Sequence, residues 1–293
     1  MLKVSKIGHA TFETADLDRQ LDYYTDILGL AVVDRSAKSA VLACPADHCS
    51  VVLQQGTRAG CVKLSLELPA PFEAKAILSQ LADAGIKGVL KSDAQEGASQ
   101  TIAVTTPDGL NVDLIPAKAP GGMRSPTGII PGKLGHIAFK VQDVQKTVDF
   151  YVKGLGFRVS DWMGDFFAFL RCGPDHHTVN LLRGPLPKMH HIAFEADNWD
   201  HIRRASDMLS ERNIPIIWGP GRHGIGHNIF IYHRNPDGQI VELYTELDKM
   251  SVEEFGYFDP QPWHRDKPQF PKVWDPALPS NVWGPPVPDG FRD

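Results

Sequence analysis

A repeat at a fixed offset constrains the fold of this chain more than any other feature. Five residues of the first half recur in the second at an offset of 127 (136 minus 9): His9, Asp16, Tyr24, Leu28 and Gly29 match His136, Asp143, Tyr151, Leu155 and Gly156. Residues 107–109 likewise match residues 236–238, which places Asp113 opposite Glu242 at an offset of 129 (242 minus 113). The same structural unit is therefore expected twice.

Each half is predicted to consist in turn of two smaller units with the order strand, helix and three strands. In the third unit a strand at 135–141 leads to Asp143, which suits a helix N-cap, and Gly156 suits the helix end. Its further strands are expected at 157–160, 166–171 and 177–182. The fourth unit predicts a strand at 190–196, a helix at 199–212 and strands near 214–218, 227–233 and 239–245. The pattern predicts an α+β fold of two tandem domains, each with two βαβββ modules.

Composition suggests where these domains end. We expect an N-terminal domain at 1–118, a Pro- and Gly-rich linker at 119–132, a C-terminal domain at 133–248 and a tail at 249–293. Frequent prolines exclude regular helix from the tail. Its large aromatic residues predict that it packs on the folded domain, as a lid or a subunit contact.

The overall composition excludes several classes of protein. The 293 residues are 42% hydrophobic and 22% charged, as in globular proteins, and a net charge of -5 offers no basic face for nucleic acid. Apolar runs are too short to span a membrane, and no export signal is visible, so we expect a cytoplasmic protein. The four cysteines show no Cys-x-x-Cys spacing and are expected to be buried free thiols.

Two histidines that open the same short motif suggest a metal site. His136 and His191 each precede Ile-Ala-Phe, and Glu242 lies in a later strand. Two histidines and one carboxylate form the facial triad of non-haem Fe(II) oxygenases, which leaves metal positions open. Because strand side chains alternate, His190 should point away from the metal. The alternatives are hydrogen-bonded core histidines, and Glu246 in place of Glu242.

With these motifs, residues 5–248 resemble the type I extradiol ring-cleaving dioxygenases of the vicinal oxygen chelate superfamily. The resemblance implies a catalytic second domain, with Fe(II), or less commonly Mn(II), bound by His136, His191 and Glu242. It also implies a degenerate first domain, which keeps His9 and Asp113 but has Lys63 and Leu64 where the middle histidine would be.

The resemblance extends to the catalytic residues. His177, fourteen residues before His191 (191 minus 177), matches the family's acid/base histidine, and the neighbouring His176 is expected at the surface. Tyr232 matches a phenol that binds a substrate hydroxyl. His223 matches a second pocket histidine.

His223 lies in a glycine-rich segment. Residues 219–224 match Gly-x-Gly-x-x-Gly, but a strand follows them where a dinucleotide site needs a helix, so we expect a glycine-rich active-site loop. Trp218, Phe169 and Arg222 are the expected substrate-pocket residues.

The implied reaction is extradiol cleavage of a catechol by O2, which gives a 2-hydroxymuconic semialdehyde type product. Trp218 and Ser280 align with arginines that hold the substrate carboxylate in homoprotocatechuate-cleaving relatives, so we expect neutral catechols. A homo-oligomer (dimer, tetramer or larger) is also expected. The alternatives are a glyoxalase-like isomerase, whose metal has four protein ligands, and a metal-free binding protein of the bleomycin-resistance kind.

Overall fold

The computed structural model describes residues 2–92 and 100–292, and it consists of four successive βαβββ modules. Two modules form each domain, as the internal repeat predicts. The elements of the first domain are β1 (Lys6–Thr14), α1 (Leu17–Asp22), η1 (Tyr23–Ile27), β2 (Ala31–Arg35), β3 (Ser39–Ala43), β4 (Val51–Gln55), β5 (Gly60–Leu68), α2 (Ala74–Asp83), β6 (Val89–Lys91), β7 (Thr101–Thr105) and β8 (Asn111–Pro116).

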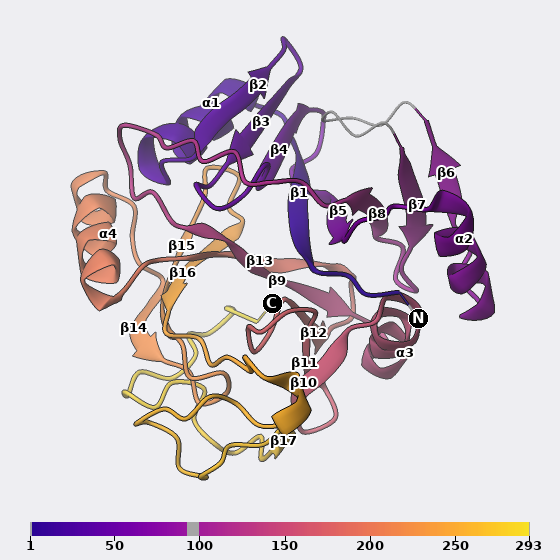
Figure 1. Cartoon of the computed structure of the whole chain (residues 1–293). Helices are drawn as coiled ribbons and strands as arrows, with labels where there is room; N and C mark the ends of the chain where they lie inside the picture. Colours follow the sequence, from indigo (N-terminus) through magenta and orange to yellow (C-terminus); the bar gives the residue numbers. More distant parts are fainter. Residues whose placement is uncertain (1, 93–99, 293) are drawn as a thin grey trace.

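The second domain repeats this order and is followed by a long tail (Figure 1). Its elements are β9 (Lys133–Val141), α3 (Val144–Asp149), η2 (Phe150–Gly154), β10 (Arg158–Met163), β11 (Phe167–Arg171), β12 (Val179–Arg183), β13 (Lys188–Glu195), α4 (Trp199–Glu211), β14 (Trp218–Arg222), β15 (Ile229–Arg234) and β16 (Ile240–Thr245). The proposed linker, 119–132, contains neither helix nor strand.

Helix capping explains why equivalent residues of the two domains match. The side chains of Asp16 and Asp143 accept hydrogen bonds from the backbone N–H groups of Arg19 and Lys146, at 3.1 and 3.0 Å. Such N-caps satisfy donors that the first helical turn leaves unpaired. The expected helix starts are therefore confirmed.

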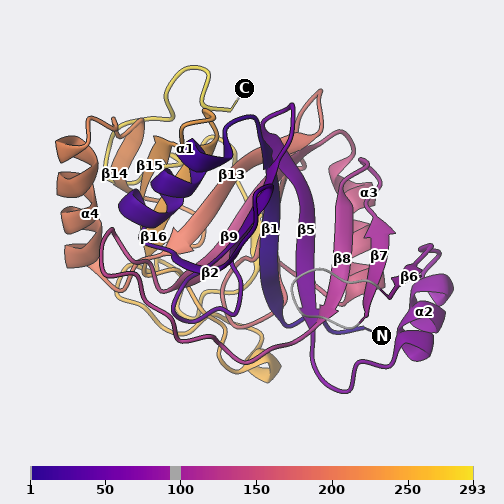
Figure 2. The ribbon, with the colours of Figure 1, turned by 90° about the horizontal axis from the view of Figure 1, so that it is seen from above.

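Each domain is built on one mixed sheet, in which two modules join along their first strands. The strand order is β2-β3-β4-β1-β5-β8-β7-β6 in the first sheet and β14-β15-β16-β13-β9-β12-β11-β10-β17 in the second, where β17 (Lys272–Trp274) belongs to the tail. The central pairs β1–β5 and β9–β13 are antiparallel. Figure 2 shows these pairs crossing the middle of the molecule, with α4 and α2 at opposite ends.

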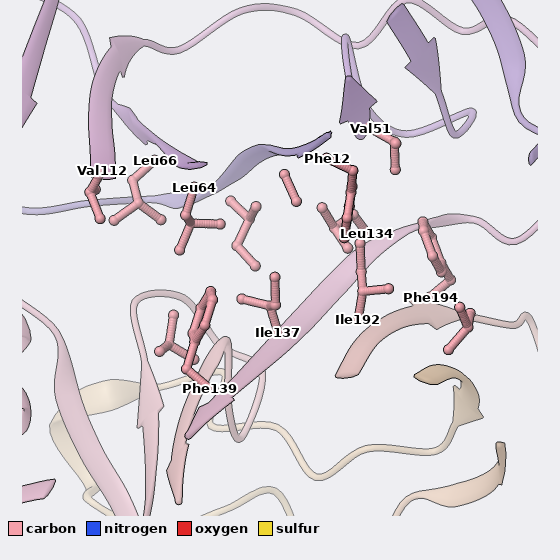
Figure 3. Close-up of a cluster of buried hydrophobic side chains, with 14 of the residues drawn as sticks. Phe12, Val51, Leu64, Leu66, Val112, Leu134, Ile137, Phe139, Ile192 and Phe194 are labelled. Carbon is pink, nitrogen blue, oxygen red and sulfur yellow. The ribbon is translucent and has the colours of Figure 1, made fainter. Parts of the chain in front are cut away.

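The two sheets pack against each other through one apolar face each. Figure 3 shows Phe12, Leu64 and Leu66 of the first domain meeting Ile137 and other apolar side chains of the second. Since neighbouring side chains of a strand point to opposite faces, Ile137 enters this core while His136 points to the other face. The core therefore turns the polar face of the second sheet away from the first domain.

One strand differs from the prediction. The strand expected near 214–218 begins at Trp218 and extends to Arg222, so the glycine-rich segment forms β14 and only its end is a loop. β14 is an edge strand, where Pro220 interrupts no central ladder of hydrogen bonds. The expectation that residues 219–224 form a loop was wrong for residues 219–222.

The tail packs on the second domain. It contains a 3-10 turn, η3 (Glu253–Phe255), and a short strand, β17 (Lys272–Trp274), which pairs in parallel with β10.

Among the described residues, no helix combines the length and apolar character needed to cross a membrane. The four cysteines are free thiols, of which Cys44 and Cys49 are buried, as expected, whereas Cys61 and Cys172 are half-buried.

Candidate metal centre and its cavity

Strand register brings the three predicted ligands together on the polar face of the second sheet. Ala193 of β13 pairs with His136 of β9 on one side and with Glu242 of β16 on the other. His191 lies two residues before Ala193 and therefore on the same face. Three adjacent strands thus direct the three side chains to one point.

The three ligand atoms are close to one another. Glu242 Oε2 lies 3.0 Å from His136 Nε2 and 3.2 Å from His191 Nε2, and the two nitrogens are 3.3 Å apart. All three side chains are buried, with Glu242 only 1% exposed. The three atoms are therefore close enough to one another to bind a single ion.

The chemistry of this donor set fits a divalent metal ion. A buried carboxylate is costly unless it is paired with charge or bound to a metal. Burial would raise the pKa of the Glu242 carboxyl, but His136 and His191 outweigh this effect and hold that pKa well below its ordinary value. Burial lowers the pKa of His191, so its ring is neutral, the form that binds metals.

Further contacts separate Glu242 from its competitor. The second oxygen of Glu242, Oε1, accepts a hydrogen bond from Asn228 Nδ2 at 2.9 Å, which orients the carboxylate. Glu246 lies beyond the end of β16, where its Oε2 is 2.6 Å from Arg222 Nη2. Glu246 is therefore part of an ion pair and does not join the cluster.

A second buried group, His227, Asp248 and His264, also contains three possible ligands. Here the two histidines contact different carboxylate oxygens, at 2.6 Å from Oδ2 and 2.8 Å from Oδ1. Trp263 Nε1 also donates to Oδ1. The carboxylate is thus satisfied by three neighbouring groups, and we interpret this group as a hydrogen-bond network that joins the tail to the second domain.

The first domain has an equivalent row of residues, in which a lysine replaces one histidine. His9, Ser65 and Asp113 form the matching row across β1, β5 and β8. Lys63, two residues before Ser65, takes the place of the middle histidine, and its Nζ lies 3.1 Å from Asp113 Oδ2. A fixed ammonium group therefore neutralises this carboxylate, and among the described residues no group of three possible ligands lies in the first domain.

His177 lies beside the cluster, as predicted. Its ring centroid is 4.3 Å from that of His136, and it lines the cavity in front of the ligands. Burial, with His136 and His176 nearby, lowers the pKa of His177 well below its ordinary value. The ring is therefore neutral at pH 7 and able to accept a proton.

The two expectations for the neighbouring histidines were wrong. His176 is buried, 1% exposed, and its Nδ1 lies 2.9 Å from His177 Nδ1, because both residues lie in the turn before β12 and not in a regular strand. His190 faces the same side as His191, with their Nδ1 atoms 2.7 Å apart. A register shift between Met189 and His191 places His190 in a bulge, which removes the strict alternation of side chains.

Tyr232 and His223 form a pair on the other side of the cluster. Tyr232 faces Glu242 across β15 and β16, and its Oη lies 3.0 Å from His223 Nε2. Burial raises the pKa of Tyr232 well above its ordinary value and lowers the pKa of His223 to about 4. His223 Nδ1 donates to the carbonyl oxygen of Ser280 in the tail, so the Tyr232 hydroxyl donates to His223 Nε2.

A cavity of about 480 Å³ opens onto these residues. The three expected pocket residues, Trp218, Phe169 and Arg222, all line it, together with tail residues such as Trp274 and Phe291. The charge of Arg222 is already satisfied, because Nη2 contacts Glu246 and Nη1 donates to the carbonyl oxygen of His227 at 2.6 Å. Arg222 thus forms part of the wall without offering a free positive charge.

Several residues of the site were not predicted. Asn228 holds Glu242, Asp161 contacts His176, and Asn180 lines the cavity with an unpartnered buried Oδ1. Asp161 and Asn180 both lie opposite Phe169 of β11, on the two neighbouring strands, so they share a face with that pocket residue. This strand register could not be predicted from the spacing of residues along the chain.

Comparisons with known proteins show which family and which relatives the chain is similar to. A family model described as Glyoxalase/Bleomycin resistance protein/Dioxygenase superfamily matches residues 6–114 and 133–243. Over 269 residues the chain is 28% identical to "Metapyrocatechase 2" from Cupriavidus necator, which covers 84% of this chain and 82% of that protein. It is 26% identical over 269 residues to the "Manganese-dependent 2,3-dihydroxybiphenyl 1,2-dioxygenase" from Geobacillus genomosp. 3, which covers 83% and 85%.

Two solved structures are similar in fold. An Mn(II)-bound protein from Novosphingobium aromaticivorans, described as a glyoxalase, superposes with a TM-score of 0.84 at 28% identity, covering 97% of this chain and 92% of that one. Homoprotocatechuate 2,3-dioxygenase from Brevibacterium fuscum superposes with a TM-score of 0.82, covering 99% and 92%. Its 22% identity shows a shared fold alone.

Proposed function

The chain belongs to the Glyoxalase/Bleomycin resistance protein/Dioxygenase superfamily, and from this premise we propose that it is an extradiol dioxygenase. Such an enzyme cleaves a catechol-type ring beside its two hydroxyl groups and adds both atoms of O2 to the product. The observation that carries the proposal is a three-ligand cluster that shares one cavity with a neutral histidine and a Tyr-His pair. Its relatives named above as a metapyrocatechase and a dihydroxybiphenyl dioxygenase support the same reaction.

His136, His191 and Glu242 would hold the metal ion, which we propose to be Fe(II), with Mn(II) as the alternative. Such an ion, when bound, offers open positions where the diol and O2 meet, and a path for electrons from the ring to oxygen. The manganese-dependent relative makes Mn(II) a serious candidate. Metal analysis of protein purified without air distinguishes the two.

His177 would move the protons of the reaction. Its neutral ring can take a proton from one substrate hydroxyl and return it when negative charge has moved to the oxygen that joined the ring. Because its pKa is lowered, the His177 ring is unprotonated at neutral pH and has a lone pair for the substrate proton. His177 is therefore proposed as the acid/base residue.

Tyr232 and His223 would position the substrate. The Tyr232 phenol stays protonated, and its oxygen keeps lone pairs that can accept a hydrogen bond from a substrate hydroxyl. Their mutual hydrogen bond and the Ser280 carbonyl fix both groups before substrate enters, which is the condition for electrostatic stabilisation of a transition state.

The cavity favours neutral, substituted catechols. Its volume lies in the range that holds a small organic ligand with substituents, and Phe169, Trp218 and Phe291 give it apolar walls. Since Arg222 is paired, the remaining cationic lining groups are Arg265, Lys272 and Arg292 of the tail. Lys272 is paired with Asp266, and Arg292 donates to the Ser280 hydroxyl, so Arg265 and Arg292 are the lining cations that have no carboxylate partner among the described residues.

The isomerase alternative predicts a different ligand set. A glyoxalase-like metal centre has four protein ligands, whereas the group of His136, His191 and Glu242 has three. An isomerase also leaves the convergence of His177, His223 and Tyr232 without a purpose. A metal-free binding protein would need no ligand cluster at all.

One experiment separates these functions. The protein is loaded with Fe(II) or Mn(II) without air, mixed with a panel of catechols, and followed for yellow product and for O2 uptake. We expect one O2 consumed for each catechol cleaved. Colourless mixtures and no O2 uptake with either metal would refute the dioxygenase.

We also expect a homo-oligomer, which light scattering can measure.

A further inference from the structure

We propose that Asp161 and His176 set the position of the proton on His177, through a chain of buried hydrogen bonds that leaves His177 Nε2 as a base facing the cavity. The role as a base rests on the proposed function, whereas the position of the proton can be measured independently. Asp161 and His176 are thus positioning residues, which act on substrate only through His177.

The direction of this chain follows from what each atom can donate. A carboxylate only accepts hydrogen bonds. Asp161 Oδ1 accepts from the backbone N–H of Lys272 at 2.7 Å, and Asp161 Oδ2 lies 2.9 Å from His176 Nε2. The second contact therefore requires a proton on His176 Nε2.

The next link follows from the first. A neutral His176 with its proton on Nε2 has a lone pair on Nδ1. That atom lies 2.9 Å from His177 Nδ1, so His177 must donate an Nδ1–H to it. A neutral His177 then has its lone pair on Nε2, which has no hydrogen-bond partner among the described residues, and its ring lines the cavity.

The surroundings hold the chain in this geometry. Asp161, His176 and His177 are 2%, 1% and 3% exposed, so water does not compete for these contacts. The His176 ring lies between Phe169 and Phe258, and its backbone N–H donates to the Asp248 carbonyl oxygen at 2.8 Å. The Asp161 end is fixed by β17 of the tail.

The variant Asp161→Asn tests the proposal, because it keeps the shape of the side chain but reverses donor and acceptor in each hydrogen bond from residue 161 to His177. The oxygen of the new amide can still accept from Lys272, so the NH2 group of that amide donates to His176 Nε2. His176 must then carry its proton on Nδ1, and His177 is forced to hold its own on Nε2. In serine proteases the equivalent Asp-to-Asn change acts through the wrong histidine tautomer.

We expect the loaded Asp161→Asn enzyme to lose roughly 10²-fold in kcat, with metal content and KM close to wild type. Asp165→Asn is the matched control, since Asp165 is exposed and paired with surface Arg183. It should leave all three measurements unchanged. An Asp161→Asn enzyme with wild-type kcat would overturn the proposal.

The proton itself is observed by ¹⁵N NMR of histidine-labelled, Zn(II)-loaded full-length protein. We expect His177 to carry its proton on Nδ1 in the wild type and on Nε2 in Asp161→Asn. A wild-type His177 with its proton on Nε2 would overturn the proposal, even if the variant does not fold. The expected tautomers without any catechol cleavage by wild type would instead refute the proposed function.

A double variant distinguishes polarity from packing. In Asp161→Asn/His176→Asn, the amide at 176 can rotate to accept from His177 Nδ1 whatever residue 161 donates. We expect kcat to recover at least about tenfold relative to Asp161→Asn alone. No recovery, with unchanged thermal stability, would show that Asp161 acts through packing and contradict the proposal.

Discussion

The duplicated architecture allows a graded test of the metal site. We expect metal affinity to fall most in Glu242→Ala, less in Asn228→Ala and not at all in His9→Ala. Glu242 supplies one of three ligand atoms, whereas Asn228 only donates to Glu242 Oε1 at 2.9 Å. His9, the counterpart of His136 in the first domain, lies 2.8 Å from Ser65 Oγ, and the neighbouring carboxylate is held by Lys63.

The magnitudes follow from these positions. Removal of a residue that only orients a ligand typically costs 10- to 100-fold in affinity, and each tenfold step corresponds to about 1.4 kcal/mol. Asn228→Ala should therefore cost about 1.4 to 2.8 kcal/mol of binding free energy. Glu242→Ala, which removes both a ligand and the negative charge of the cluster, should exceed about 2.8 kcal/mol.

Mn(II) is a suitable probe because its free form is measured directly by electron paramagnetic resonance. Titrations of wild type and the three variants, each checked for unchanged thermal unfolding of the metal-free protein, give the affinities. Equal affinity in wild type and Glu242→Ala would refute the assigned site. A loss in His9→Ala as large as that in Glu242→Ala would place a metal in the first domain.

Three further predictions concern turnover. His177→Phe should keep the metal and bind catechol but lower kcat by roughly 10²-fold, and a wild-type rate across pH would exclude His177 as the acid/base residue. Deletion of residues 260–293 removes the Ser280 carbonyl that holds His223, so kcat/KM should fall roughly tenfold or more while the ligands still bind Mn(II); full activity would show that the tail is not needed for catalysis. An unpaired carboxylate in an apolar pocket costs several kcal/mol, so 3-methylcatechol should be cleaved with a higher kcat/KM than 3,4-dihydroxyphenylacetate, and the opposite order would show that a tail cation binds the carboxylate.

Local sequence patterns were sufficient to predict the repeated modules and the three residues of the candidate metal cluster. Asp16 and Asp143 cap their helices through bonds that span only a few residues, so the repeat could be translated directly into structure. His136 and His191 open identical strands, and strand alternation sends both to one face once the strands pair. Lys63 in the first domain could be recognised as a substitution for the same reason.

The neighbours of these residues depended on irregular backbone. The bulge at His190 and the turn at His176 break the alternation on which the prediction relied, so His190 lines the cavity and His176 is buried against His177. Bulges and turns are stabilised by contacts with distant segments, such as the Phe291 carbonyl oxygen that accepts from His190 Nε2 at 2.9 Å. A local pattern carries little information about them.

The sequence alone thus predicted two domains of two βαβββ modules each, because short-range capping and strand periodicity act within each module, and it identified His136, His191 and Glu242 as candidate ligands. Only the tertiary structure decided that Arg222 is neutralised by Glu246, that Asp161 reaches His177 through His176, and which tail residues line the cavity. These contacts join residues from separate strands and loops. Their partners are chosen by sheet register and packing, which arise only when the whole chain has folded.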